Sequence, residues 1–172
     1  MIDGAIRGLR GIDGRFIDAI GFYLDDPTTA LCGGGGGEAF TDPVLTWEPA
    51  IQAIASITIG ADRYVDSIQI TYLLADGSRY AAPRHGGDGG KLHPIVFRDG
   101  EHIIAVSGNC GDFVNQIGFT TQDGNGETRV YGPYGGGGGG QVFDVVGDVI
   151  GFFGRCGRYV DAIAAYLVPN GR

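Results

Sequence analysis

Residues 147–167 read GDVIGFFGRCGRYVDAIAAYL, and residues 4–24 read GAIRGLRGIDGRFIDAIGFYL. The two stretches align over 21 residues without a gap and share ten residues, including four glycines and one Asp. Two weaker copies lie between them: SITIGADRYVDSIQITYL begins at Ser56, and AVSGNCGDFVNQIGFTT begins at Ala105. A regular internal repeat indicates several copies of one supersecondary unit packed together.

The repeat keeps a constant length along the chain. Aligned on their acidic position, the four copies place Asp18, Asp66, Asn115 and Asp161 at successive spacings of 48, 49 and 46 residues. Glycine clusters follow the first three of these positions by 15 to 20 residues, at 33–37, 86–90 and 135–140. One unit is therefore a strand, a short glycine-containing turn, a second strand, and a glycine loop flanked by two further strands.

Strands are predicted from the alternation of side chains. Ile68, Ile70 and Tyr72 fall on one face of an extended segment, whereas Gln69 and Thr71 fall on the other. No stretch shows a sustained helical period of apolar residues with capping signals, so helix should be scarce. The sequence predicts an all-β protein of three near-equivalent four-stranded sheets.

Length and composition limit the classes of function. The chain has 172 residues, which suits one domain, and 43% of them are hydrophobic, enough for a core. Its net charge of −8 argues against nucleic acid or an anionic membrane surface as a partner. No apolar run approaches the ~18–20 residues of a membrane span. The first ten residues lack the pattern of a secretory signal, so the default expectation is a cytoplasmic location.

Three cysteines occur, at Cys32, Cys110 and Cys156. Their odd number and the absence of a C-x-x-C pair argue against a disulfide framework and against structural zinc. We expect reduced, mostly buried thiols, with Cys32 partly exposed beside its glycine cluster, and we expect no metal or other cofactor.

The repeated turn has the form Gly-x-x-x-Asp, as in Gly157–Asp161. Glycine permits the positive φ that a tight turn often requires, and such a turn can leave successive backbone N–H groups pointing outward. An adjacent carboxylate and a nearby glycine loop would add an acceptor and another donor, a combination that suits neighbouring sugar hydroxyls. The structural alternative is an ordinary hairpin turn whose Asp caps its own backbone.

The combination of motifs resembles the jacalin-related lectins. GGGGG and GGDGG loops occur together with GRYVDAI, GRFIDAI and VDSIQITY, and the resemblance covers residues 27–168. It implies a β-prism I fold, in which three Greek-key sheets surround a pseudo-threefold axis, and a monosaccharide site formed by a turn and a glycine loop. In that family, galactose binding goes with a cleavage that frees an N-terminal glycine beside the site. The loop at 33–37 is internal here, so mannose or glucose is expected.

The resemblance also implies site residues, carried over from matching positions. The first sugar site would comprise Gly34, Gly35, Gly157, Arg158, Tyr159 and Asp161. The second would comprise Asp62, Arg63, Tyr64, Asp66 and Gly87, with Asp62 in place of the usual glycine. An extra site could be formed by Gly14, Arg15, Phe16 and Asp18. A fourth group, Gly111, Asp112, Phe113 and Asn115, has Asn for Asp and is expected to be weak or empty, because a neutral hydrogen bond is weaker than a charge-assisted one.

One feature departs from the family. Residues 4–24 and 147–167 suit the same place beside the strands that flank the first glycine loop, so one hairpin is surplus. We therefore divide the chain into an extra repeat hairpin, 1–26, and a lectin-like domain, 27–172. The spare hairpin would either pair with another chain to form a homo-oligomer or be the tail of a preceding unit.

The sequence thus favours a non-catalytic, metal-independent lectin that binds mannose-containing glycans. The alternative is a structural or oligomerisation module with degenerate sugar sites. A carbohydrate-active enzyme is disfavoured, because no motif supports a catalytic pair of carboxylates.

Overall fold

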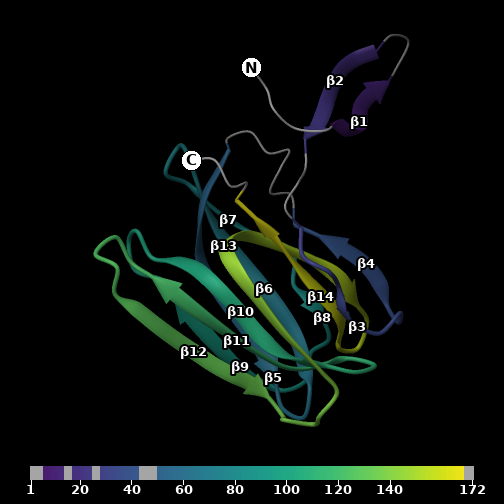
Figure 1. The fold of residues 1–172 in the computed structure, drawn as a ribbon, viewed down its shortest axis with the longest axis vertical. Helices are drawn as coiled ribbons and strands as arrows, with labels where there is room; N and C mark the ends of the chain where they lie inside the picture. Colours follow the sequence, from purple (N-terminus) through teal and green to yellow (C-terminus); the bar gives the residue numbers. More distant parts are fainter. Residues whose placement is uncertain (1–5, 14–16, 25–27, 43–49, 169–172) are drawn as a thin grey trace.

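The computed structural model describes residues 6–13, 17–24, 28–42 and 50–168, the first two segments as backbone only. Every regular element in these segments is a β-strand (Figure 1). The strands are β1 Ile6–Asp13, β2 Ile17–Leu24, β3 Cys32–Gly33, β4 Glu38–Thr41, β5 Ile51–Ala61, β6 Val65–Leu74, β7 Arg79–Ala81, β8 His85–Gly86, β9 Lys91–Val96, β10 His102–Cys110, β11 Val114–Gln122, β12 Thr128–Gly135, β13 Gln141–Cys156 and β14 Val160–Leu167. No helix in these residues is long and apolar enough to span a membrane.

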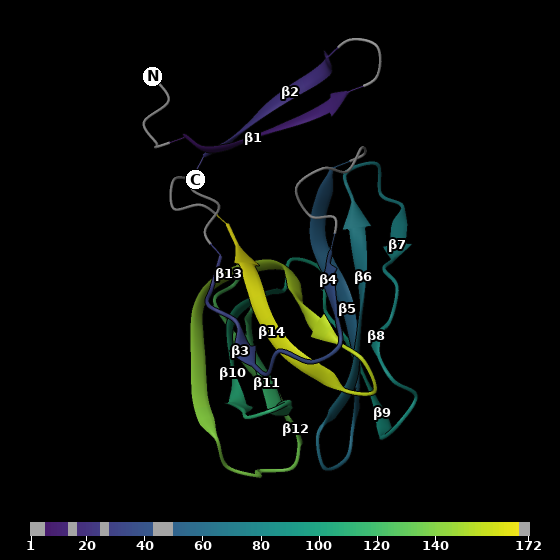
Figure 2. The same cartoon turned by 90° about the vertical axis from the view of Figure 1, so that its right-hand side faces the viewer.

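Three antiparallel sheets enclose the core, as predicted for a β-prism. The second sheet has the order β7-β6-β5-β9. The short strand β8 also pairs with β6, along a different part of it from β7. The third sheet has the order β12-β11-β10-β13. The first sheet combines β3, β14, β13 and β4. Figure 2 shows the second sheet, in blue and teal, facing the other two.

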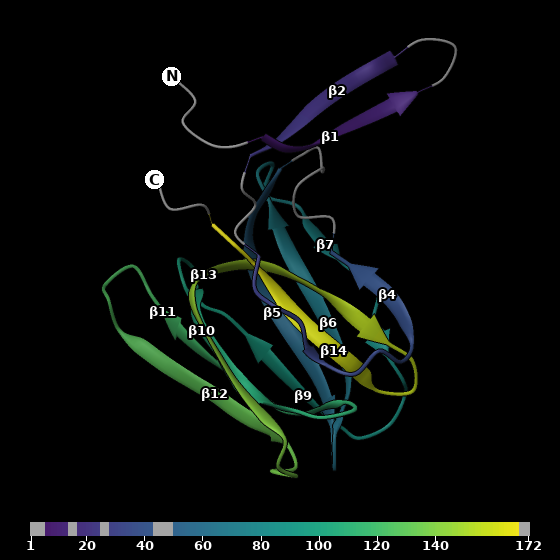
Figure 3. The same cartoon turned by 45° about the vertical axis from the view of Figure 1, so that its right-hand side comes forward.

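The long strand β13 belongs to two sheets. Its residues up to Val149 pair with β10, whereas those from Val149 to Cys156 pair with β14, and Phe153 to Cys156 also pair with β4. Figure 3 shows β13 curving from the third sheet into the first. The change of partner turns one continuous hydrogen-bonded network into two faces of the prism.

The β13–β14 hairpin, and not the N-terminal copy, occupies the place beside β3 and β4. The hairpin of β1 and β2 forms a separate two-stranded sheet, drawn in purple in Figure 1. Both hairpins carry the same sequence pattern, so the pattern alone could not choose between them. The pairing of the spare hairpin with another chain stays a prediction.

The core lies where the three sheets face one another. The largest fully buried side chains come from all three, among them Tyr72 of the second sheet, Phe119 of the third and Phe152 of the first. A buried polar link joins two of the sheets: Tyr72 donates a hydrogen bond to Asp42, after β4, at 2.5 Å, and the backbone N–H of Phe152 donates to the same carboxylate at 3.3 Å.

The prediction of three reduced thiols is wrong for two of them. Cys32 of β3 and Cys110 of β10 form a disulfide, with their Cα atoms 5.9 Å apart. An odd count and the lack of a local pair say nothing about residues 78 positions apart that the fold brings together. Cys156 is free, and burial raises the pKa of its thiol.

Candidate sugar-binding sites

The three Gly-x-x-x-Asp-type turns meet around the axis of the prism. They join β5 to β6, β10 to β11 and β13 to β14. Each contributes one aromatic ring. The ring centroid of Tyr64 lies 5.3 Å from that of Phe113 and 5.3 Å from that of Tyr159, and the centroids of Phe113 and Tyr159 are 4.9 Å apart. This cluster fixes the three turns, and therefore the three candidate sites, at one end of the molecule.

The turns share one internal hydrogen bond. The first residue of each turn donates its N–H to the carbonyl oxygen of the third: Gly157 to Tyr159 and Gly111 to Phe113 at 2.9 Å, and Asp62 to Tyr64 at 3.1 Å. No non-glycine residue with described backbone has a positive φ, so Asp62 forms the turn in an ordinary conformation. The departure from glycine at Asp62 therefore leaves the second turn intact.

At the first site, the glycine loop closes around the carboxylate of Asp161. The N–H of Gly34 donates to the backbone oxygen of Asp161 at 2.9 Å. Gly37 has φ +59°, and a Cβ there would lie 2.6 Å from Oδ2 of Asp161, while a Cβ on Gly36 would collide with Oδ1. Arg155 holds the loop by donating to the carbonyl oxygens of Gly36 and Gly37 at 2.7 and 2.6 Å. Only glycine permits this approach.

The second site repeats this arrangement. The N–H of Gly87 donates to the backbone oxygen of Asp66 at 2.9 Å. Gly90 has φ +71°, and a Cβ there would lie 2.5 Å from Oδ2 of Asp66, while a Cβ on Gly89 would collide with Oδ1. Burial and the like charge of Asp62 raise the pKa of Asp66, while hydrogen bonds from backbone N–H groups of the turn and the positive charge of Arg158 act in the opposite direction.

The two carboxylates are buried without being satisfied. Asp161 is 5% exposed and Asp66 is 6% exposed. Oδ2 of each has no hydrogen-bond partner within the described part of the chain. A buried acceptor without a donor costs about 1–3 kcal/mol, so each of these carboxylates lowers the stability of the free protein.

The third turn differs, because its amide binds its own loop. Asn115 donates from Nδ2 to the carbonyl oxygen of Gly139 at 2.6 Å. A Cβ on Gly140 would lie 3.3 Å from Nδ2 of Asn115, whereas one on Gly138 would lie 4.0 Å from Cγ and one on Gly139 would meet nothing within 4 Å. The third loop therefore contacts Asn115 near its end, and its middle glycines leave space beside the turn.

Each glycine loop also contacts the next turn around the axis. The first loop places Gly34 against the backbone of Asp112, the second places Gly87 against the backbone of Arg158, and in the third loop Gly136 donates to Arg63 O at 3.2 Å. The second residue of each turn therefore borders two sites. This relation joins units that are far apart in sequence.

The predicted site residues are partly brought together. Gly157 and Asp161 lie against the first glycine loop, whereas the ring of Tyr159 contacts the other two turns and Gly35 faces open space. Sequence reasoning missed Gly36, Gly37, Gly89 and Gly90, which contact the carboxylates, and Arg155, which holds the first loop. Positive φ at the ends of the loops is a backbone property that a run of identical glycines cannot reveal. Gly14, Arg15 and Phe16 of the predicted extra site lie outside the described residues, and Asp18 is described only as backbone within β2.

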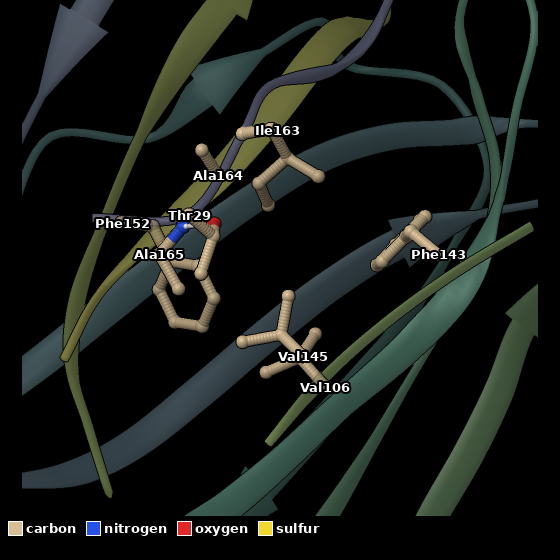
Figure 4. Close-up of a pocket in the computed structure, with 9 residues that line it drawn as sticks. Thr29, Val106, Phe143, Val145, Phe152, Ile163, Ala164 and Ala165 are labelled. Atoms are coloured by element: carbon tan, nitrogen blue, oxygen red, sulfur yellow. Dashed lines mark hydrogen bonds between the residues drawn. The ribbon is translucent and has the colours of Figure 1, made fainter. Parts of the chain in front are cut away.

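A small internal cavity does not suit a sugar. A cavity of about 20 Å³ lies between the first and third sheets (Figure 4). Its walls are mainly apolar, including Val106, Phe152 and Ile163, so it is too small and too apolar for a sugar. Among the described residues, no group of three or more His, Cys, Asp or Glu could hold a metal ion.

The fold and these sites define a lectin of the jacalin type. The model of the jacalin-like lectin domain family matches residues 29–166, and the chain belongs to this family.

Several similar proteins are named as lectins or agglutinins. The agglutinin of Castanea crenata is 32% identical over 192 residues, an alignment that covers 95% of this chain and 59% of the agglutinin. The chain thus spans less than two thirds of that relative. Wild-type Malaysian banana lectin is 31% identical, with a TM-score of 0.72, and the match covers 84% of this chain and 99% of the banana lectin chain. AcmJRL, a mannose binding jacalin related lectin from Ananas comosus, is also 31% identical, with a TM-score of 0.69, and the match covers 83% of this chain and 96% of the AcmJRL chain.

Proposed function

We propose that this chain binds mannose- or glucose-type sugars at two sites, Asp161 with the 33–37 loop and Asp66 with the 86–90 loop. The observation that carries the proposal is the unpartnered buried oxygen of each Asp, which is placed beside backbone glycines. Two neighbouring sugar hydroxyls can donate to the carboxylate and accept from loop N–H groups. Binding then needs neither a metal ion nor a chemical step.

The class of sugar is supported by the unbroken first loop and by a relative. Gly33–Gly37 is internal to the chain, so it supplies backbone N–H groups there and no free amine. AcmJRL, which is described as mannose binding, has the same fold at 31% identity. We therefore propose mannose-containing glycans as partners, with Tyr159 and Tyr64 providing apolar surface beside the first and second sites.

A single sugar should bind weakly, with a Kd near 1 mM, or about −4 kcal/mol, since few groups contact it. Two sites in one chain raise the effective affinity for a branched glycan through avidity. Isothermal titration with methyl α-mannoside should show two sites per chain and no change after treatment with EDTA. Asp161→Asn should weaken the first site about tenfold and Asp66→Asn the second, so each variant should titrate as a single site in the low millimolar range.

The control is Asp99→Asn, because Asp99 is an exposed turn residue outside both sites. Titrations unchanged by both site variants would overturn the proposal. Absence of any binding across a panel of neutral glycans would favour the alternative of a structural module with degenerate sites.

A further inference from the structure

The third turn and its glycine loop enclose an open hollow of about 430 Å³. The lining residues are Arg63, Tyr64, Gly111, Asp112, Phe113, Asn115 and Gly136 to Gly140. The loop at 135–140 is one residue longer than the loops at 33–37 and 86–90. It contacts the turn through the 2.6 Å hydrogen bond from Asn115 to Gly139, whereas a Cβ on Gly137 or Gly138 would lie 4.0 Å from the nearest side chain.

The charge of the hollow also differs from that of the other two sites. Asn115 replaces the buried Asp, so the carboxylate that would repel an anion is missing. The positive charge in the hollow comes from Arg63 of the second turn, whose guanidinium lies over the ring of Tyr64, 5.4 Å from its centre. Arg63 makes no ion pair among the described residues. The one acidic lining residue, Asp112, is exposed and therefore screened by water.

Backbone donors complete the wall. Gly139 donates to the carbonyl oxygen of Gly137 at 2.8 Å, whereas the N–H of Gly137 has no acceptor in the described segments. Gly138 also donates within the loop, to the carbonyl oxygen of Gly136 at 2.8 Å, so Gly137 supplies the free backbone N–H that an anion can accept from. The hydrogen bond from Asn115 to Gly139 uses Nδ2, so Oδ1 of the same side chain is left as an acceptor. The hollow thus offers a cation, an N–H donor, an acceptor and two aromatic rings.

We propose that this third site binds a sugar that carries a carboxylate, of the hexuronic acid class. The carboxylate pairs with Arg63 and the glycine N–H, and a ring hydroxyl donates to Asn115. The open hollow accommodates the one additional oxygen atom on C6. This site adjoins the second neutral-sugar site, with which it shares Arg63 and Tyr64, but it does not need the carboxylates of Asp66 and Asp161.

The test compares two probes that differ only at C6, methyl β-glucuronide and methyl β-glucoside. In ¹H–¹⁵N spectra, the glucuronide at about 10 mM, above the Kd expected of a single sugar, should shift the amides of Gly137 to Gly139. The glucoside should shift them much less. Arg63→Gln should weaken glucuronide binding about tenfold, because a charge-assisted contact is lost. Arg79→Gln, at an exposed arginine of β7, is the matched control and should change nothing.

Two further variants separate this site from the others. Asn115→Asp places a negative charge in the hollow and should weaken glucuronide binding. The variant should still fold, because Asp occupies the equivalent positions 66 and 161. The double variant Asp66→Asn with Asp161→Asn should lose methyl α-mannoside binding and retain glucuronide binding. Equal shifts with both probes, an unchanged affinity in Arg63→Gln, or loss of glucuronide binding in the double variant would each overturn the proposal.

Discussion

Replacing Asp66 by Asn should make the free protein more stable while weakening its sugar binding. The carboxylate is 6% exposed and its Oδ2 has no partner in the described residues. An unsatisfied buried group costs about 1–3 kcal/mol, and part of this cost disappears when the charge is removed. Asn115 shows that an amide at this position of the repeat can donate to its own glycine loop, at 2.6 Å.

The gain should be about 1 kcal/mol at pH 7, equivalent to a rise in Tm of ~2–4 °C for a protein of this size. Its pH dependence follows from the pKa of Asp66, which burial and Asp62 raise. A raised pKa in the folded state means that stability falls as the pH rises through it. The advantage of Asn should therefore be full at neutral pH and vanish below about pH 3.8, where Asp is protonated in both states.

The opposite effect is expected on binding. The second site loses its charged acceptor, so its affinity for methyl α-mannoside should fall about tenfold, the difference between a charge-assisted and a neutral hydrogen bond. Calorimetric melting from pH 3 to pH 8 and isothermal titration measure the two effects. Asp99→Asn should change neither. A variant that melts lower at every pH, or that binds as the parent does, would refute the reasoning.

Three further outcomes are expected. Gly36→Ala should displace the carboxylate beside it and abolish binding at the first site in titrations, whereas Gly124→Ala, where a Cβ meets nothing within 4 Å, should bind normally. Replacing both Cys32 and Cys110 by Ser should cost about 4 kcal/mol in urea unfolding, because the bond closes a loop of 78 residues, and no loss would contradict the disulfide. Burial raises the pKa of Glu101, but hydrogen bonds and a nearby arginine outweigh it and lower this pKa. Glu101→Gln should therefore destabilise by about 2 kcal/mol at pH 7, an effect lost as the pH falls through that lowered pKa and measurable by unfolding at pH 7 and pH 3.

The periodic features of the fold could be predicted because they are repeated in sequence. Spacings near 48 residues located the turns, and the alternation around Ile68 and Tyr72 located a strand of the second sheet. The turns themselves carry the same hydrogen bond three times, including the one that begins at Asp62. Local patterns thus predicted the units and their number.

Relations between units could not be predicted from those patterns. The disulfide joins β3 to β10, and Gly87 of one unit lies against the backbone of Arg158 of another. No pairing rule within one repeat specifies these neighbours, because they depend on how three units close around an axis. The choice between the hairpins at 4–24 and 147–167 was unpredictable for the same reason. Their sequence patterns match, and only the strand pairing shows that β13 and β14 lie beside β4 and β3.

The sharing of β13 between two sheets has a consequence during synthesis. Cys32 pairs with Ile163, so the first sheet closes only after residue 163 has left the ribosome. Until then, residues of β3 and β4 have unpaired edges, which are the surfaces through which nascent chains associate wrongly. Contacts of such long sequence separation also slow folding to the millisecond-to-second range. β13 and β14, which are translated after the other strands of the prism, therefore complete two of its faces together.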